Sequence, residues 1–412
     1  MFYGWWVAAT AVAIYFFSNG LTVMVPQALA PRLMESFTAT AADVSRSSLI
    51  TFTVAACLAP FAGALVDRFG VLRVLRTGLL ALALSVAAYS FAGSLRQLYL
   101  LHAVFGVGLA LAGLLVNVVL LSRWFVARRG LVVGVLTSGS SLAGATLPLA
   151  ISPLVTDPAL GWRWGYGALG AAFLLLALLP GFLVLREDPA QVGQQPDGAT
   201  AAAGAVAQPH TGVTLRRALR SLTLWCLALG SACLWFAMQA VISQATIFLE
   251  QEADFTPAAA TAVFSLMFAM SFVGKLLYGT VSDWFAKRRV MLAASLTLLA
   301  GCLLLFEPGS DGPGLVTDPS RLRLFAVVFG LGFGGSFTMI QLTVVESFGQ
   351  RDLGKILGVV TFIDAIGAGL GAALAGQLAT ATGSYLAPFA MVTLVALLAV
   401  ANVFLIRPVA PD

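Results

Sequence analysis

The sequence GALVDRFGVLR at residues 63–73 returns in a looser form, GTVSDWFAKRR, at residues 279–289. Each copy follows a long apolar run, and the two copies occupy corresponding places in the two halves of the 412-residue chain. Glycine lets neighbouring membrane helices approach closely, aspartate can cap a helix or pair with a base, and the trailing Lys and Arg residues prefer the cytosolic surface. The repeat therefore predicts a duplicated architecture in which each copy is a short loop between two membrane helices.

Apolar residues make up 59% of the chain and charged residues 10%, and the mean hydropathy is strongly positive. A soluble protein needs more polar residues than this to cover its surface. The composition therefore predicts a polytopic membrane protein that is surrounded by the lipid bilayer. All four cysteines lie inside apolar runs, without the spacing of a metal site, so we interpret them as packing residues. We expect no cofactor and no metal.

Apolar segments of membrane-spanning length recur through both halves of the chain. A helix needs about 20 apolar residues to cross the hydrocarbon core. The fold class that we predict is an all-α membrane protein, with twelve transmembrane helices in two pseudo-symmetric six-helix bundles. The predicted helices cover residues 4–29, 47–65, 74–93, 97–121, 131–155, 165–185, 222–249, 257–281, 290–306, 322–345, 356–379 and 385–406.

The two predicted bundles comprise residues 1–186 and 221–412, and residues 187–220 are predicted to form a cytosolic linker. Within the linker, residues 187–214 are rich in Ala, Gly, Gln and Pro, so we expect this stretch to be flexible and to bury nothing. Most of the 23 Lys and Arg residues fall in loops on the same side of the membrane as the termini. Such loops are retained in the cytosol, so both termini are predicted to be cytosolic. The basic charge then reflects topology, and we expect no nucleic-acid partner.

Further stretches indicate the kind of membrane protein. WFVARRGLVVGVLTSG at residues 124–139 resembles the helix-five signature of monocarboxylate transporters and of bacterial oxalate/formate antiporters. YGWW at 3–6 resembles the opening of helix one in that group, without the usual preceding acid, and ESFGQRDLG at 346–354 resembles its loop after helix ten. The repeat at 63–73 and 279–289 resembles the loop between helices two and three of the major facilitator superfamily, and its second-half counterpart. The resemblance covers essentially all twelve helices and implies the major facilitator fold.

Two glycine patterns could be mistaken for other sites. GLGFGG at residues 330–335 matches the dinucleotide fingerprint, but it lies inside a spanning apolar run with no strand before it. Close helix packing explains it better, as it does the small-residue spacing of Gly367, Gly371 and Ala375. The chain has no G-x-S-x-G or H-E-x-x-H motif, so the sequence does not predict an enzyme.

Two ionisable residues, Lys275 and Asp364, fall inside predicted helices eight and eleven. An ionised side chain at the centre of a membrane helix costs about 2.5–3.5 kcal/mol, so such residues tend to line a polar cavity. The resembled group carries an Arg at the helix-eight position that holds the substrate carboxylate, which implies this role for Lys275. Its oxalate/formate members carry a second base where this chain has Asp364, so the acid favours a monoanion and a proton carried by Asp364. The alternative is an inert salt bridge between the two residues.

Other polar residues on predicted helices are candidates for substrate binding. Asn117 matches a position that binds the carboxylate in bacterial lactate-transporting relatives, although an interhelical hydrogen bond would also explain it. We interpret His102 as a packed or interfacial residue. The weaker candidates are Asn19, Thr22, Gln239, Gln244 and Gln341.

Charged residues at the predicted cytosolic ends of helices are candidates for gating, because these ends must separate and rejoin during alternating access. This set consists of Asp67, Arg68, Arg128, Asp283 and Glu346.

The resemblance implies a secondary active transporter of a small organic anion, and we expect a monocarboxylate carried with a proton by alternating access. The alternatives are an anion exchanger, an efflux pump for an apolar drug-like compound and a non-transporting membrane sensor. We expect a monomer that spans the bacterial inner membrane many times.

Overall fold

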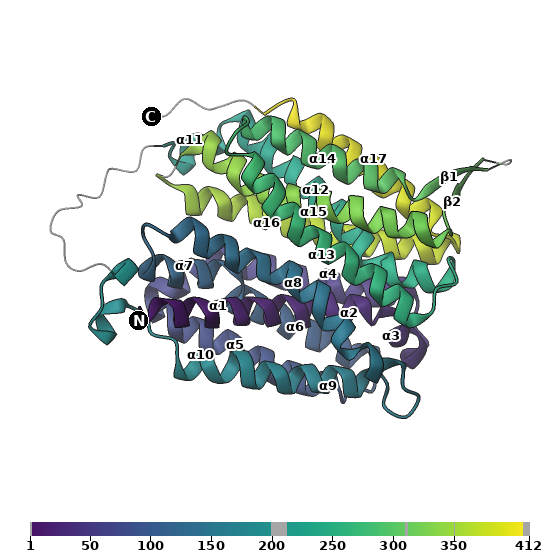
Figure 1. Ribbon diagram of the computed structural model, residues 1–412, viewed down its shortest axis with the longest axis horizontal. Helices are drawn as coiled ribbons and strands as arrows, with labels where there is room; N and C mark the ends of the chain where they lie inside the picture. The colour runs from purple at the N-terminus through teal and green to yellow at the C-terminus, as the bar shows by residue number, and fades with distance from the viewer. Residues whose placement is uncertain (1, 199–211, 310–311, 350, 407–412) are drawn as a thin grey trace. The chain divides into compact units, whose positions relative to one another are not determined.

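The computed structural model describes residues 2–198, 212–309, 312–349 and 351–406, and most of these residues are helical. Contacts divide the chain into two compact units, each a bundle of long helices (Figure 1). Unit one consists of Met1–Pro26 and Cys57–Gln208, and unit two consists of Gln27–Ala56 and Pro209–Asp412. Unit two therefore takes in a segment that belongs to the first half of the sequence.

The first half of the chain forms six long helical rods, some of them built from consecutive pieces. The rods are α1 (Gly4–Asn19) with η1 (Gly20–Met24) and α2 (Val25–Ala28), α4 (Ala41–Phe69), α5 (Val71–Tyr89), α6 (Leu95–Ala112) with α7 (Leu114–Trp124), α8 (Arg129–Thr156), and α9 (Gly161–Phe173) with η2 (Leu174–Leu178) and α10 (Leu179–Leu183). The shorter helices are α3 (Ala30–Phe37), η3 (Pro189–Val192) and η4 (Pro196–Gly198).

The second half forms six more rods and a β-hairpin, β1 (Phe306–Gly309) with β2 (Gly312–Leu315), in which Phe306 lies opposite Leu315. The hydropathy pattern of the sequence does not predict this hairpin. The six rods are α12 (Leu222–Gln251), α13 (Pro257–Val281), α14 (Lys287–Leu303), α15 (Pro319–Phe348), α16 (Leu353–Thr382) and α17 (Leu386–Val403). The short helix α11 (Leu215–Leu219) precedes them.

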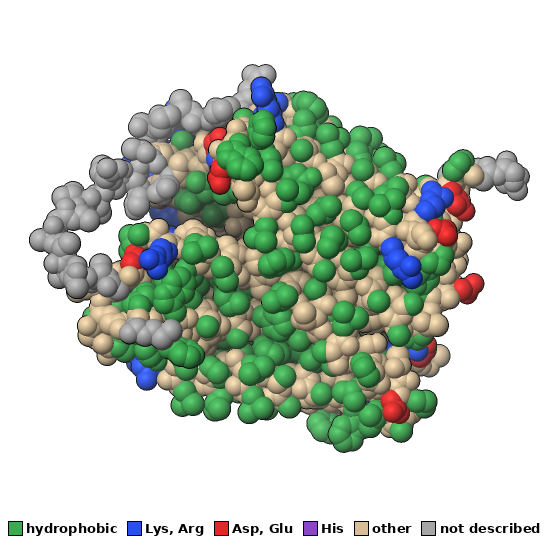
Figure 2. Space-filling view, viewed as in Figure 1, with side chains coloured by type: hydrophobic (Ala, Val, Ile, Leu, Met, Phe, Trp, Pro, Cys, Tyr) green, Lys and Arg blue, Asp and Glu red, His purple; other side chains and the backbone are tan. Residues whose placement is uncertain are grey.

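Among the described residues, eleven helical rods are long and apolar enough to cross a membrane. The helix α14 is shorter, with 17 residues, and completes the predicted set of twelve. Figure 2 shows hydrophobic side chains along the visible helices and charged side chains near helix ends. This distribution is expected of helices surrounded by lipid. The predicted all-α, twelve-helix class is confirmed.

Helix α4 begins at Ala41 and not at the predicted residue 47. A reciprocal cap explains the earlier start, because the backbone N–H of Asp43 donates to Thr40 Oγ1 (3.2 Å) and the Thr40 N–H donates to Asp43 Oδ2 (3.0 Å). The cap lets the helix include polar residues that the hydropathy pattern alone assigns to a loop.

The glycine run at residues 330–335 packs α15 against two neighbouring helices. A Cβ on Gly334 would collide with the Ser271 carbonyl oxygen in α13, and a Cβ on Gly332 would collide with the Leu298 backbone in α14. The glycines therefore allow backbone-to-backbone contact on two sides of one helix. The interpretation of this run as a packing motif is confirmed.

The expectation that residues 187–214 bury nothing is wrong at both ends of this stretch. In unit one, Pro189 is buried, and the Asp197 carboxylate accepts hydrogen bonds from the backbone N–H groups of Val126 (2.9 Å) and Ala127 (2.7 Å). In unit two, Val213 is buried and its N–H donates to the Phe348 carbonyl (2.8 Å). A polar segment can order in this way because unpaired backbone groups of helix-connecting loops need partners.

The middle of the predicted linker, residues 199–211, lies outside the described residues, as does His210. The bundle boundaries at residues 186 and 221 stay a prediction.

The duplication predicted from the repeat has a structural counterpart in two arginines. Arg76 at the start of α5 donates to the carbonyls of Gly181 (3.3 Å) and Phe182 (3.0 Å) at the end of α10. Arg288 at the start of α14 donates to the carbonyls of Val403 (3.1 Å) and Phe404 (2.6 Å) at the end of α17. Each arginine satisfies the orphan carbonyls of a neighbouring helix C-terminus.

Candidate functional site

Lys275 is a buried lysine on α13, with 6% of its surface exposed. Its Nζ lies 4.3 Å from the centre of the Phe337 ring on α15, which is a cation–π geometry. Gly334 fixes this position, because a Cβ there would come within 2.8 Å of the Lys275 backbone nitrogen. The close packing of α13 on α15 therefore places the ammonium against an aromatic face.

A second aromatic residue extends this surface. Trp235 on α12 contacts Phe337 edge to face, with ring centres 5.7 Å apart and an interplanar angle of 71°. Trp235 is partly exposed, whereas Phe337 is buried. We call Lys275, Phe337 and Trp235 the aromatic–lysine cluster. It joins three helices of unit two, α12, α13 and α15.

Two predicted glutamines lie one helical turn from the two rings. Gln239 follows Trp235 on α12, and Gln341 follows Phe337 on α15. Gln239 is buried, and its Nε2 has no hydrogen-bond partner within the described part of the chain. Gln341 is partly exposed. Both candidates thus lie beside the aromatic–lysine cluster, and their role in binding stays a prediction.

Asp364 on α16 is also buried, with 8% of its surface exposed. Ser231 on α12 donates a hydrogen bond of 2.5 Å to its Oδ1. Ser231 precedes Trp235 by one turn, so one stripe of α12 carries Ser231, Trp235 and Gln239. This stripe links the carboxyl group to the cluster. A direct Lys275–Asp364 pair stays a prediction.

Phe337, Trp235 and Ser231 are not among the site residues predicted from the sequence. Aromatic and hydroxyl side chains are common in membrane helices, and none of the three stands out by itself. The available signal was their spacing, since Trp235 and Phe337 each lie four residues before a candidate glutamine.

In unit one, Asn117 lies at a break in the fourth rod. Its Nδ2 donates to the carbonyls of Ala112 (2.9 Å) and Gly113 (2.7 Å) at the break between α6 and α7. Its Oδ1 is buried without a hydrogen-bond partner among the residues described. The amide donors that could bind an anion are therefore engaged with backbone, and substrate binding by Asn117 stays a prediction.

Asn19 lies where the first rod changes from α-helix to the π-helical segment η1. Its Nδ2 donates to the Tyr15 carbonyl (3.4 Å). The hydroxyl of Tyr166 on α9 donates to the Leu21 carbonyl within η1 (2.5 Å). A π-helical segment often marks a functional position in a helix. Its presence beside Asn19 is consistent with the predicted role.

His102 is packed, as predicted. It is buried, and its Nε2 lies 3.1 Å from the hydroxyl of Tyr89 on α5. The Tyr89 ring in turn stacks on Tyr166, with ring centres 4.2 Å apart.

The predicted gating residues lie at helix ends and in loops. Asp67, Arg68, Asp283 and Glu346 are exposed. Arg128 is exposed too, with its backbone N–H donating to Asp197 Oδ1 (3.3 Å) and its guanidinium 5.9 Å from the centre of the Trp5 ring. Their function in gating stays a prediction.

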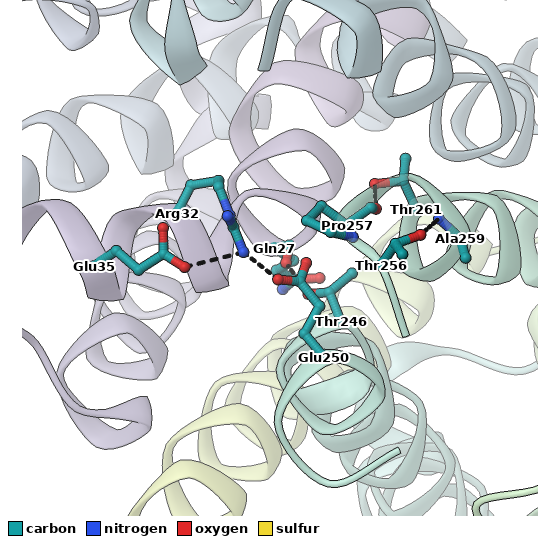
Figure 3. Close-up of polar contacts among 9 residues, drawn as sticks. All are labelled: Gln27, Arg32, Glu35, Thr246, Glu250, Thr256, Pro257, Ala259 and Thr261. Carbon is teal, nitrogen blue, oxygen red and sulfur yellow. Dashed lines mark hydrogen bonds and ion pairs between the residues drawn. The ribbon is translucent and has the colours of Figure 1, made fainter. Parts of the chain in front are cut away.

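A charged cluster lies at the far end of α12 in unit two. Figure 3 shows the guanidinium of Arg32 on α3 between the carboxylates of Glu35 and Glu250. The side chains of Arg32 and Glu250 are 24% and 12% exposed, so this ion pair is largely shielded from water. Beside it, the hydroxyl of Thr246 donates to the Gln27 carbonyl (2.9 Å). These contacts tie α2 and α3 to α12.

Comparison with known proteins places the chain in a family. The Major Facilitator Superfamily matches residues 9–363 and, in a second match, residues 227–412. The chain belongs to this superfamily. Among its superfamily relatives, monocarboxylate transporter 13 of Bos taurus is 28% identical over 404 residues, which cover 94% of this chain and 85% of that protein. An agnestins efflux protein of Paecilomyces divaricatus is 25% identical over 319 residues, which cover 77% of this chain and 67% of that protein.

A solved superfamily structure has the same fold. It is a bacterial homologue of the human lysosomal transporter Spinster in an inward-facing, unoccupied conformation. Its TM-score is 0.77 at 17% identity, with 98% of this chain and 97% of that chain covered. The chain is thus a multi-pass membrane transporter with the major facilitator fold, and this family and fold are not enzymes.

Proposed function

We propose that this transporter carries a small monocarboxylate together with a proton by alternating access. The observation that carries the proposal is Lys275, a buried ammonium group among the apolar helices of unit two. A charge in a membrane helix is costly, and its presence is explained if it neutralises an anionic substrate during the cycle. One lysine offers one positive charge, which matches one carboxylate. Similarity to proteins named monocarboxylate transporters supports the same substrate class.

Asp364 is the proposed proton carrier. It is buried on α16 and hydrogen-bonded to Ser231, so an ionised carboxylate there has little access to water. Binding of a substrate anion nearby would add a second negative charge, and like charges favour protonation of one of the two groups. Substrate and proton would then bind with positive cooperativity.

The proposal extends to the organisation of the chain. Residues 1–186 and 221–412 would be the moving bundles, with residues 187–220 as the linker and both termini in the cytosol of a bacterial cell. Asp67, Arg68, Arg128, Asp283 and Glu346 would form the cytosolic gate, and the transporter would act as a monomer.

The test is uptake of radiolabelled acetate, lactate and benzoate into liposomes that contain the purified protein, with the outside more acidic. Lys275→Ala should lower uptake at least tenfold, because the anion loses its countercharge, whereas Lys275→Arg should retain part of it. Lys355→Ala is the matched control, since that lysine is exposed and pairs with Asp352. Uptake by Lys275→Ala at the wild-type rate would contradict the proposal.

Efflux of an apolar compound is the second candidate. The aromatic partners of Lys275 and the similarity to an efflux protein favour it. An efflux pump for uncharged compounds should keep its activity in Lys275→Ala. Anion exchange, the remaining alternative, should show uptake that requires an anion on the opposite side and is indifferent to the pH gradient.

A further inference from the structure

The aromatic–lysine cluster bears on the kind of carboxylate that the transporter prefers, an inference that rests on the proposed function. A carboxylate oxygen that accepts a hydrogen bond from an ammonium lies about 2.8 Å from the nitrogen. The Nζ of Lys275 lies 4.3 Å from the centre of the Phe337 ring. A group attached to a carboxylate that is bound to Lys275 on the side of Phe337 would therefore begin close to an aromatic surface.

The second ring limits what this group can be. Trp235 stands edge to face against Phe337, so the two side chains form an aromatic corner whose Phe337 ring lies next to the ammonium. An α-hydroxyl of a small hydroxy acid that pointed toward the two rings would meet ring carbons, and a polar group without a hydrogen-bond partner is unfavourable. A planar ring would meet the same surface with favourable offset or edge-to-face contacts.

We propose that the preferred substrate is an aryl monocarboxylate, of the size of benzoate or phenylacetate. Lys275 binds the carboxylate, and Trp235 and Phe337 pack against the aryl ring as specificity-determining residues. Gln239 lies one turn beyond Trp235 with a buried amide nitrogen that has no hydrogen-bond partner in the described part of the chain. This amide is a donor for the second carboxylate oxygen or for a ring substituent.

The expected selectivity separates aromatic character from size. A well-oriented pair of aromatic rings gains more binding free energy than the burial of its apolar area alone provides. This additional free energy corresponds to about a two- to tenfold higher affinity. Benzoate and phenylacetate should therefore compete two- to tenfold better than cyclohexanecarboxylate, which has a similar size and no π system. Acetate and lactate should compete more weakly than all three.

The experiment is competition by these five acids against labelled benzoate in liposomes with the purified transporter. Phe337→Leu and Trp235→Leu should abolish the preference for aryl over cyclohexyl acids while leaving competition by the cyclohexyl acid within about twofold, because that contact depends on apolar area alone. Trp235→Phe should restore the preference. Phe325→Leu is the matched control, since Phe325 lies on the same helix, three turns away from Phe337.

The outcomes distinguish the two proposals. If none of labelled acetate, lactate and benzoate is taken up, or if Lys275→Ala takes up and binds all acids like the wild type, the proposed function fails. If all acids depend on Lys275 but the aryl and cyclohexyl acids compete equally in the wild type, only the aryl preference is overturned. That wild-type comparison requires no variant to fold. Retention of the aryl preference in both leucine variants would also overturn it.

Discussion

Asp364 is a carboxyl group in a helix interior, and the hydroxyl of Ser231 can donate a hydrogen bond to it in either step of a proton cycle. Asp364→Asn keeps the size and the hydrogen bond but removes the ionisable group. It should retain exchange of substrate between the two sides and lose net uptake driven by a pH gradient at least tenfold, because only net uptake requires release of the proton. Both rates can be measured in the same liposomes.

Ser231→Ala is the companion variant. It removes the hydrogen bond and leaves the carboxyl group, so pH-driven uptake should persist. Equal loss of exchange and net uptake in Asp364→Asn would assign Asp364 a structural role, and unchanged pH-driven uptake would exclude it from coupling.

The buried charges of the candidate site could be predicted from the sequence, because a single ionisable residue in an apolar run is conspicuous. Their partners could not. Phe337 contacts Lys275, Trp235 contacts Phe337 and Ser231 contacts Asp364, each across a different helix interface. Those interfaces depend on which faces the glycines of α15 and α16 bring together. Asn117 illustrates the same limit, since its donors are engaged at a helix break that hydropathy does not reveal.

At the scale of helices, the position of Lys275 depends on the contact of α13 with α15. Gly334→Ala places a methyl group against the Ser271 carbonyl and the Lys275 backbone. Forcing an additional carbon into such a contact costs about 1–3 kcal/mol and should separate the helices next to the ammonium. We expect a lower melting temperature of the purified protein and a weaker substrate-induced stabilisation.

Gly358→Ala on α16 is the matched control. A Cβ at Gly358 has no neighbour within 4 Å, and alanine favours a helix interior by about 1 kcal/mol over glycine. That variant should be neutral or stabilised. A neutral result for Gly334→Ala as well would show that α13 and α15 can separate there without consequence.

Asp197 holds the loop between α7 and α8. Partial burial acts to raise its pKa, but the hydrogen bonds from Ala127, Val126 and Arg128 and the charge of Arg128 outweigh it and leave the pKa below the usual value. A lowered carboxyl pKa means that the stabilisation is present above the unfolded-state pKa and is lost as pH falls through the lowered value. Hydrogen exchange of these three amides should therefore become less protected in acid.

Asp197→Ala should remove this pH dependence and expose the three amides at neutral pH. Exchange that stays slow in the variant would mean that another group holds the loop.

The helices themselves could be predicted, because long apolar runs determine them. The ordered ends of the linker and the β-hairpin could not, since short polar segments such as η3 order through tertiary partners and carry no periodic pattern.

At the scale of the whole molecule, the first and second rods change unit partway along, near Pro26 and Ala56. Residues 27–56 pack within unit two although the chain joins them to the first bundle. Their contacts include the Arg32–Glu250 ion pair and the hydrogen bond from Gln244 Nε2 to Ser45 Oγ (2.8 Å). If the two sequence halves rock against each other during transport, these contacts must break once in every cycle.

Loss of the Arg32–Glu250 ion pair should therefore favour the conformation in which residues 27–56 have separated from the rest of unit two. Arg32→Gln and Glu250→Gln each remove a contribution of about 1 kcal/mol, which corresponds to about a fivefold shift in the equilibrium. The measurement is labelling of Ser45→Cys, in a background without native cysteines, by a membrane-impermeant maleimide. Each variant should label about fivefold faster, and the double variant should label no faster than either single one, because the two residues share one interaction.

Glu35→Gln is the control, since the Glu35 side chain is 62% exposed and its contact with Arg32 is screened by water. Additive effects of the two substitutions, or labelling at the wild-type rate in both, would mean that Arg32 and Glu250 do not hold this conformation together.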